Sequence, residues 1–168
     1  MIAPLTRESV LQVRSADGWL DLQNPAEALL ELEAITSDEK NHPVVLEMFW
    51  RVYAAWQKWQ PAFDVGEQLI TLHPSLPAGW IDRAYAVRRM KGGGLAAACE
   101  ALLPAFEWFP DEAIIPYNLA CYCAQLGQLE EARKWLAAAL TRGDRPTLLK
   151  MARNDPDLEP LKALGHLE

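Results

Sequence analysis

The stretch "IPYNLACYCAQLGQLEEARKWLAAAL", residues 115–140, decides the fold class of this chain. Its second half places apolar side chains three and four positions apart, which is the spacing of one face of an α-helix. These side chains are Leu129, Ala132, Trp135, Leu136, Ala139 and Leu140. Gly127 precedes them at the position of a turn. Because alternating runs of β-branched residues do not occur in the sequence, we predict an all-α fold.

A helical repeat runs through the chain. One series of equivalent positions is Ala28, Ala62, Ala98 and Ala132, and another is Trp19, Tyr53, Val87 and Cys123. Each series advances by 34 residues, except for one step of 36. The long step ends at Ala98 in the first series and begins at Val87 in the second, so two additional residues lie between them. Gly92–Gly94 stand there and predict an elongated turn between two helices.

A helix–turn–helix unit of 34 residues is similar to the tetratricopeptide repeat. The matching positions are Leu119 and Ala120 on a first helix, Gly127 at the turn, Ala132, Leu136 and Ala139 on a second helix, Pro74 and Pro110 at unit ends, and Trp80 at the start of a first helix. The resemblance implies a right-handed α-α superhelix, a solenoid of helix–turn–helix pairs, in a single domain over 1–168. It places the units at about 9–42, 43–76, 77–112 and 113–145, with capping helices within 146–166.

The apolar periodicity and the turn residues together predict the helix boundaries. Helices are expected over 6–22, 25–37, 44–57, 61–72, 78–90, 94–108, 113–126, 129–142, 146–153 and 156–164. Pro104 lies inside the sixth of these helices. An interior proline removes a backbone hydrogen bond at a cost of ~3 kcal/mol, so we expect a kink there.

The composition limits the classes of partner. The formal net charge is −7 and the sequence pI is about 5.0, which argues against nucleic acid as a ligand. No signal-peptide pattern opens the sequence, and no apolar run reaches the ~18 residues of a membrane span. Three cysteines fit reduced thiols, so we predict a cytoplasmic protein, as a monomer or weak homodimer. The final Leu167-Glu168 resembles a cloning remnant and carries no weight.

The resemblance also implies a binding surface. First helices of successive tetratricopeptide units line a concave groove that holds peptides. The residues that fall there are Asp17, Asp21, Glu47, Arg51, Tyr85, Arg88, Arg89, Tyr117 and Gln125. Glu47 and Arg51 replace the Lys and Asn of the family's carboxylate clamp, so that clamp is not supported. The two tyrosines and two arginines predict an acidic protein or peptide segment as ligand. A solvated groove without a tight ligand is the alternative.

The remaining candidates favour structural roles. Cys121 and Cys123 point about 200° apart on a helix, which favours core thiols over a metal site. Loop or packing roles are expected for His42, His73 and His166, and core positions for Trp19, Trp50, Trp80 and Trp135. Trp56 and Trp59 are candidates for an exposed aromatic patch. No catalytic residue, cofactor site or metal site is predicted.

Three functional hypotheses follow. The first is a non-catalytic protein–protein interaction module, a scaffold or adaptor. The second is a chaperone-like protein for a secreted or unstable partner. The third, of another class, is an enzyme that binds a nucleotide or phosphate at Gly92–Gly94, since glycine-rich turns that precede a helix can hold anions.

Overall fold

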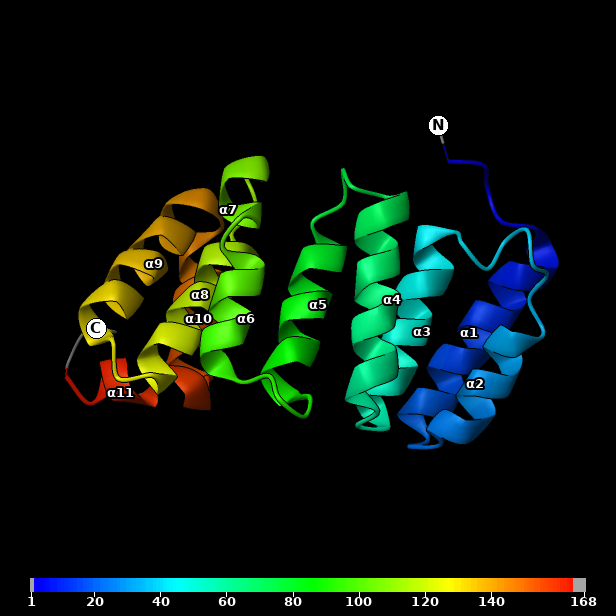
Figure 1. Cartoon of the computed structure of the whole chain (residues 1–168), viewed down its shortest axis with the longest axis horizontal. Coiled ribbons are helices and arrows are strands. Elements are labelled where there is room, and N and C mark those ends of the chain that lie inside the picture. The colour runs from blue at the N-terminus through cyan, green and yellow to red at the C-terminus, as the bar shows by residue number, and fades with distance from the viewer. Residues whose placement is uncertain (1, 165–168) are drawn as a thin grey trace. The chain divides into compact units, whose positions relative to one another are not determined.

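The structure is a computed structural model that describes residues 2–164 (Figure 1). Every regular element within this range is a helix, which confirms the all-α class. The chain divides into two compact units, one up to Ala86 and the other from Val87 onward. The expected single domain over the whole chain stays a prediction. His166 and Leu167-Glu168 lie outside the described residues, as does the end of the expected cap.

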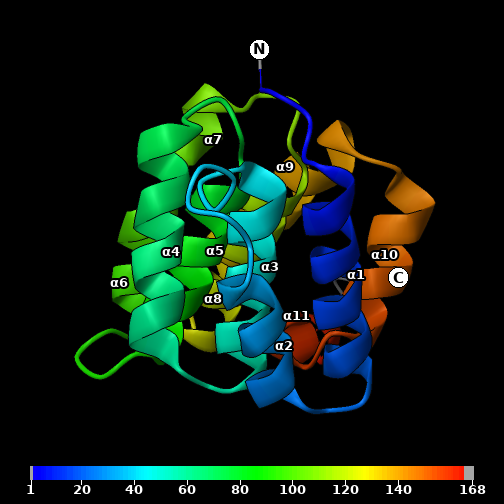
Figure 2. The ribbon, with the colours of Figure 1, turned by 90° about the vertical axis from the view of Figure 1, so that its right-hand side faces the viewer.

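Unit 1, up to Ala86, consists of helix pairs. Its elements are α1 (Arg7–Asp21), α2 (Pro25–Glu33), α3 (Pro43–Ala55), α4 (Trp59–Leu72) and the larger part of α5 (Ala78–Arg89). Helix α1 packs on α2 and α3 packs on α4, while α3 also contacts α1 and α2 (Figure 2). Prolines open α2 and α3, a position where the missing N–H has no intrahelical partner. One core cluster joins the first three helices through Ala16, Ala28, Leu32, Ile35, Val45, Met48 and Val52.

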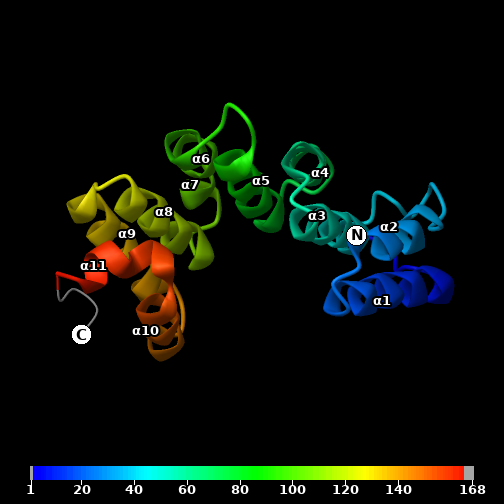
Figure 3. The same cartoon turned by 90° about the horizontal axis from the view of Figure 1, so that it is seen from below.

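Unit 2, from Val87 onward, holds the other helix pair and the cap. Its elements after α5 are α6 (Leu95–Leu102), α7 (Ala105–Trp108), α8 (Ile114–Gln125), α9 (Leu129–Arg142), α10 (Arg145–Asn154), the 3-10 segment η1 (Pro156–Leu158) and α11 (Glu159–Lys162). Helix α8 packs on α9 and α6, and both α10 and α11 contact α9 (Figure 3). The predicted C-terminal cap is confirmed, because α11 and η1 cover α8 through buried Leu158 and Leu161.

The first repeat series consists of closely packed alanines. Ala28, Ala62, Ala98 and Ala132 are all fully buried, one on the second helix of each predicted pair. Helices that cross at 8–10 Å leave room only for small side chains at the contact. The repeat therefore preserves small residues at these four positions because a larger residue there would separate the helices.

The second repeat series marks the turns inside the pairs. The carbonyls of Trp19, Tyr53 and Cys123 accept hydrogen bonds from the N–H groups of Asn24, Lys58 and Gln128, at 2.9, 2.8 and 2.9 Å. The residue before each donor has a positive φ: 56° at Gln23, 57° at Gln57 and 76° at Gly127. This hydrogen bond and this backbone conformation define a Schellman turn. The same local structure thus ends three first helices.

The glycine turn departs from this pattern by two residues. The carbonyl of Val87 accepts its hydrogen bond from Gly94 at 3.0 Å, two positions later than in the other turns. Gly92 and Gly94 have φ values of 82° and 118°, which favour glycine. A Cβ on Gly93 would lie 1.9 Å from the Val87 carbonyl oxygen. The predicted two-residue insertion between Val87 and Ala98 is therefore confirmed.

Some helix boundaries differ from the prediction. The helix expected over 94–108 is interrupted rather than kinked, because α6 ends at Leu102 and α7 begins at Ala105, on either side of the turn at Pro104. The helix expected over 25–37 ends at Glu33, since residues 36–42 form a hydrogen-bonded loop that leads into α3. The segment expected as a helix over 156–164 is divided into η1 and α11.

The tryptophans vary in their surroundings. Trp19, Trp50, Trp80 and Trp135, expected in the core, are half-buried. Trp56 is 36% exposed, and the Lys58 ammonium lies 3.4 Å from its ring centroid. Trp59 is half-buried, with its ring centroid 6.1 Å from that of Tyr85. The two candidates for one aromatic patch therefore have different environments.

Glu39 connects the loop before α3 to the start of α1. Its carboxylate accepts hydrogen bonds from the Thr6 N–H at 2.6 Å, the Thr6 hydroxyl at 2.9 Å and the Ser9 hydroxyl at 2.5 Å. The Ser9 and Thr6 hydrogen bonds lower the pKa of Glu39 below its ordinary value of 4.5. A lowered pKa means that the folded state favours the ionised carboxylate, so this stabilisation is present above the ordinary pKa and is lost as pH falls through the lower value.

Glu39→Gln is therefore expected to lower the melting temperature at neutral pH, and the difference from wild type should shrink as the pH falls below 4.5. Thermal unfolding of both proteins across this pH range measures the effect. Glu33→Gln, at an exposed position of the same unit, is the control. Its difference in melting temperature from wild type should not shrink as the pH falls. If the difference in melting temperature between wild type and Glu39→Gln were the same at all pH values, the role assigned to the Glu39 charge would be wrong.

Candidate functional site

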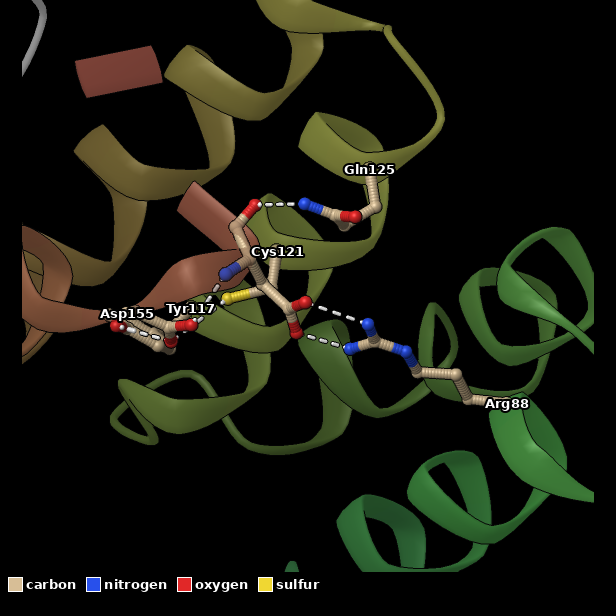
Figure 4. Close-up of polar contacts among 6 residues, drawn as sticks. Arg88, Tyr117, Cys121, Gln125 and Asp155 are labelled. Carbon is tan, nitrogen blue, oxygen red and sulfur yellow. Dashed lines mark hydrogen bonds and ion pairs between the residues drawn. The ribbon is translucent and has the colours of Figure 1, made fainter. Parts of the chain in front are cut away.

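A cluster of polar contacts in unit 2 joins the last turn of α5 to the C-terminal segment (Figure 4). The Arg88 guanidinium makes two hydrogen bonds with the Asp157 carboxylate, and the one from Nη2 to Oδ1 is 2.7 Å long. The two side chains are only 17% and 25% exposed. The hydrogen bond to Asp157 raises the pKa of Arg88 above its ordinary value. Two parallel charge-assisted hydrogen bonds of this kind hold a carboxylate strongly and in a defined orientation.

The neighbouring carboxylate, Asp155, lies against α8. The Tyr117 hydroxyl donates a hydrogen bond to Asp155 Oδ2 at 2.9 Å, and the Cys121 thiol donates to the same oxygen at 3.6 Å. Burial is the main cause that raises the pKa of Tyr117 and of Cys121. Both groups therefore keep their protons at neutral pH and act as donors.

Gln125 extends the same face of α8. Its side-chain amide donates to the backbone carbonyl of Asp157 at 2.9 Å. Tyr117, Cys121 and Gln125 are four residues apart, so they lie on one face of the helix. We call Arg88, Tyr117, Cys121 and Gln125 the α8 surface. Figure 4 shows these four side chains directed toward the segment that contains Asp155.

The structure brings three predicted groove residues of unit 2 together. Arg88, Tyr117 and Gln125 all belong to the α8 surface. The fourth, Arg89, lies close enough to Tyr122 for its positive charge to oppose the rise in the Tyr122 pKa that burial causes. Their role in binding a partner stays a prediction.

The predicted groove residues of unit 1 fall into separate places. Arg51 and Asp17 form an ion pair of 2.7 Å between successive first helices, and both are about half exposed. The ring of Tyr85 packs on Trp50 at 5.7 Å and on Trp59 at 6.1 Å. Asp21 is exposed near the end of α1. Glu47 lies near Asp82, and burial together with the charge of Glu47 raises the pKa of Asp82 to about 7.

Sequence reasoning missed the groups that contact the predicted groove residues. Asp155 and Asp157 were expected only as part of a cap, and Cys121 only as a core thiol. Cys121 and Cys123 are indeed buried. The available signal was the pair of acids around Pro156, since an acidic segment was the ligand expected for the arginines and tyrosines.

Cys121, Asp155 and Asp157 also place possible metal ligands within 4.8 Å of one another. Their surroundings do not favour a cation. The Arg88 guanidinium already neutralises Asp157, and burial raises the pKa of the Cys121 thiol, which must lose its proton to bind a metal. Asp155 accepts hydrogen bonds from two side chains. We therefore assign these residues to a hydrogen-bond network.

Gly92–Gly94 use their backbone groups inside the turn. The Gly93 N–H donates to the Met90 carbonyl at 3.1 Å, and the Gly94 N–H donates to Val87. A phosphate cradle needs such N–H groups directed at the ligand. Two of the three glycine amides are thus unavailable to an anion.

The two histidines within the described residues have loop roles. His42 caps α3 by accepting a hydrogen bond at Nδ1 from the Val44 N–H at 3.2 Å. His73 Nε2 lies 2.7 Å from the carbonyl oxygen of Asn41. His42 thus caps its own helix and His73 contacts the loop before α3, in agreement with the loop roles predicted from the sequence.

No helix within residues 2–164 combines the length and the hydropathy needed to cross a membrane.

Comparisons with known proteins identify the fold. Neither protein-family models nor curated proteins gave a match. Among solved structures, the chain is similar to TTC0263, a thermophilic TPR protein of Thermus thermophilus, with 20% identity, coverage of 94% of this chain and 84% of that one, and a TM-score of 0.73. It is also similar to MamA 41-end from Desulfovibrio magneticus RS-1, with 21% identity, 97% and 93% coverage, and a TM-score of 0.65.

A further match is the MamA RS-1 ArsTM double mutant, with 19% identity, coverage of 98% of this chain and 94% of that one, and a TM-score of 0.67. Identities near 20% establish architecture and leave function open. The matches extend over nearly the whole chain. The chain therefore has the tetratricopeptide repeat fold.

Proposed function

We propose that this chain is a non-catalytic protein-interaction module, a scaffold or adaptor, that holds an acidic segment of a protein partner on the α8 surface. One observation carries the proposal. An acidic segment of the chain itself, Asp155–Asp157, lies on that surface and contacts all four of its side chains. The cytoplasm is the proposed compartment, in keeping with the free thiols of the three cysteines.

The chemistry of the α8 surface supports this ligand class. Arg88, Tyr117, Cys121 and Gln125 all act as donors in the contacts described. Carboxylates and backbone carbonyls are the acceptors that such a surface requires, and the planar Arg88 guanidinium matches a carboxylate at two points. A partner segment with two acids separated by a single residue would reproduce the contacts of Asp155 and Asp157.

A displayed library of random peptides, selected on the full chain, tests the proposal. We expect enrichment of peptides with the pattern Asp-x-Asp. In the background Asp155→Asn/Asp157→Asn, where the chain's own carboxylates no longer bind Arg88, Arg88→Gln should weaken the binding of enriched peptides by at least about tenfold, because hydrogen bonds to charged groups contribute about 1.5–3 kcal/mol. Binding is measured by fluorescence anisotropy after circular dichroism has shown that the variant is folded.

Arg133→Gln is the matched control. It removes the same charge from α9, where Arg133 pairs with Glu130 at an exposed site. It should leave peptide binding unchanged. Enrichment of peptides without acids, or equal peptide binding by Asp155→Asn/Asp157→Asn with and without Arg88→Gln, would show that the α8 surface is not the binding site.

A further inference from the structure

The acidic segment on the α8 surface is part of the same chain. Asp155 has extended backbone angles, φ −84° and ψ 117°, and Pro156 follows it. The N–H of Asp157 donates to Asp155 Oδ1 at 2.9 Å, which directs the two carboxylates to different partners on α8 and α5. The segment thus occupies the surface in the way that a short linear peptide from another protein would.

The covalent connection gives this segment an advantage over any external ligand. It lies between α10 and α11, and α11 is anchored through buried Leu161. A tethered ligand has an effective concentration in the millimolar range or above. An external segment with the same contacts must compete against it, and its apparent affinity falls in proportion to the fraction of open surface.

The contacts of Asp155 and Asp157 are polar, and they are made by other side chains than the apolar contacts of the cap. Pro156 is exposed, and Asp155 and Asp157 are half-buried. Leu158 and Leu161, which follow, are fully buried and supply the apolar cover of α8 and α9. The two carboxylates can therefore be changed without removing the apolar anchor.

We infer that residues 155–157 are a self-ligand that blocks the α8 surface, and that an acidic partner segment binds by displacing them. This inference rests on the proposed function and adds a regulatory step to it. The partner and residues 155–157 cannot occupy the α8 surface at the same time. Weakening the self-ligand therefore increases the affinity for the partner.

A competition experiment with the full chain tests the inference. The probe is a fluorescein-labelled peptide with the sequence ARNDPDLEPL, residues 152–161. The double variant Asp155→Asn/Asp157→Asn weakens the self-ligand and keeps Arg88, Tyr117 and Gln125. We expect it to bind the probe at least about tenfold more tightly than wild type does, as measured by anisotropy.

Two controls isolate the self-ligand. Asp144→Asn removes one negative charge from the same part of the chain, and asparagine remains a good N-cap for α10, so probe binding should equal that of wild type. Addition of Arg88→Gln to the double variant should abolish the gain. A probe with both aspartates replaced by asparagine should bind no form of the chain tightly.

Hydrogen exchange on the wild-type chain gives a readout that does not depend on a folded variant. The N–H of Leu158 donates to the Asp155 carbonyl at 3.1 Å, and we expect it to be protected from exchange while the segment is in place. Saturating probe should make this amide exchange faster. Unchanged exchange with bound probe would overturn the inference.

The outcomes also separate the inference from the proposed function. If wild type and the double variant bind the probe equally well, the surface holds acidic segments but is not blocked by its own. If no form of the chain binds the probe or any acidic peptide, both the inference and the proposed function fail. If wild type is a dimer that Arg88→Gln dissociates, the occupant comes from a second copy, and the inference within one chain is wrong.

Discussion

Leu158→Ala is expected to reduce the free energy of unfolding of unit 2 by about 2–5 kcal/mol, which is the range for buried leucines. Leu158 is fully buried in η1, where it covers α8. Truncation removes apolar contacts and leaves a cavity that the short segment between α10 and α11 can fill only in part. Urea unfolding followed by tryptophan fluorescence and circular dichroism measures the loss.

The same chain offers a matched control for this truncation. Leu164→Ala makes the same chemical change a few residues later, where the side chain is 55% exposed. Its effect should stay within about 0.5 kcal/mol. Equal losses for the two variants would mean that Leu158 is not part of the core, and the assignment of η1 as a cap would be wrong.

Gly93→Ala is expected to destabilise unit 2 by about 3 kcal/mol, at the upper end of the usual range for point substitutions. The new Cβ would lie 1.9 Å from the Val87 carbonyl oxygen, an atom held in place by its hydrogen bond from Gly94. Either the turn changes conformation or the end of α5 shifts. Both responses break the hydrogen bond that closes the turn.

Gly127→Ala provides the comparison within the same unit. Gly127 has a φ of 76°, but a Cβ there would meet no atom within 4 Å. Its cost should be the conformational penalty alone, about 1–2 kcal/mol. Equilibrium unfolding of the two variants ranks them. A smaller loss for Gly93→Ala than for Gly127→Ala would refute the described geometry of the glycine turn.

The repeat could be predicted from the sequence because its causes are local and periodic. Alanines such as Ala28 and Ala132 recur where helices approach closely, and Trp19, Tyr53, Val87 and Cys123 recur where first helices end. The step of 36 residues placed the insertion correctly. A longer loop shifts the residue numbers that follow it but leaves the apolar pattern within each helix unchanged. The first helices and their turns followed from these positions.

The groove residues were predicted from their positions within the repeat. A position within the repeat does not determine which side chains are in contact. Tyr85 has the phase of a groove residue, yet its ring packs on Trp50 and Trp59 from α3 and α4. These ring contacts could not be inferred from the repeat, and the role of Tyr85 in a groove stays a prediction.

The self-ligand could not be predicted because its segment leaves the repeat. Arg88 and Asp157 are 69 residues apart, and no periodic relation connects them. Asp155-Pro156 has the local pattern of a helix start, and the structure indeed shows Asp155 accepting a hydrogen bond from Asp157 N–H. The two acids around Pro156 matched the class of ligand expected for the arginines and tyrosines, but no position in the repeat indicated the surface on which this segment lies.

Because the chain is synthesised from its N-terminus, the α8 surface is exposed for a time before residues 155–157 are made. Arg88, Tyr117 and Gln125 are synthesised well before Asp155 and Leu158, so their donors face the surrounding medium until the later segment arrives. The core clusters of unit 1 end at Leu69, and that unit can form while the rest is still being translated. A nascent chain halted before Asp155 would therefore present a folded first half and an uncovered α8, the state in which chaperones and wrong partners have access to it.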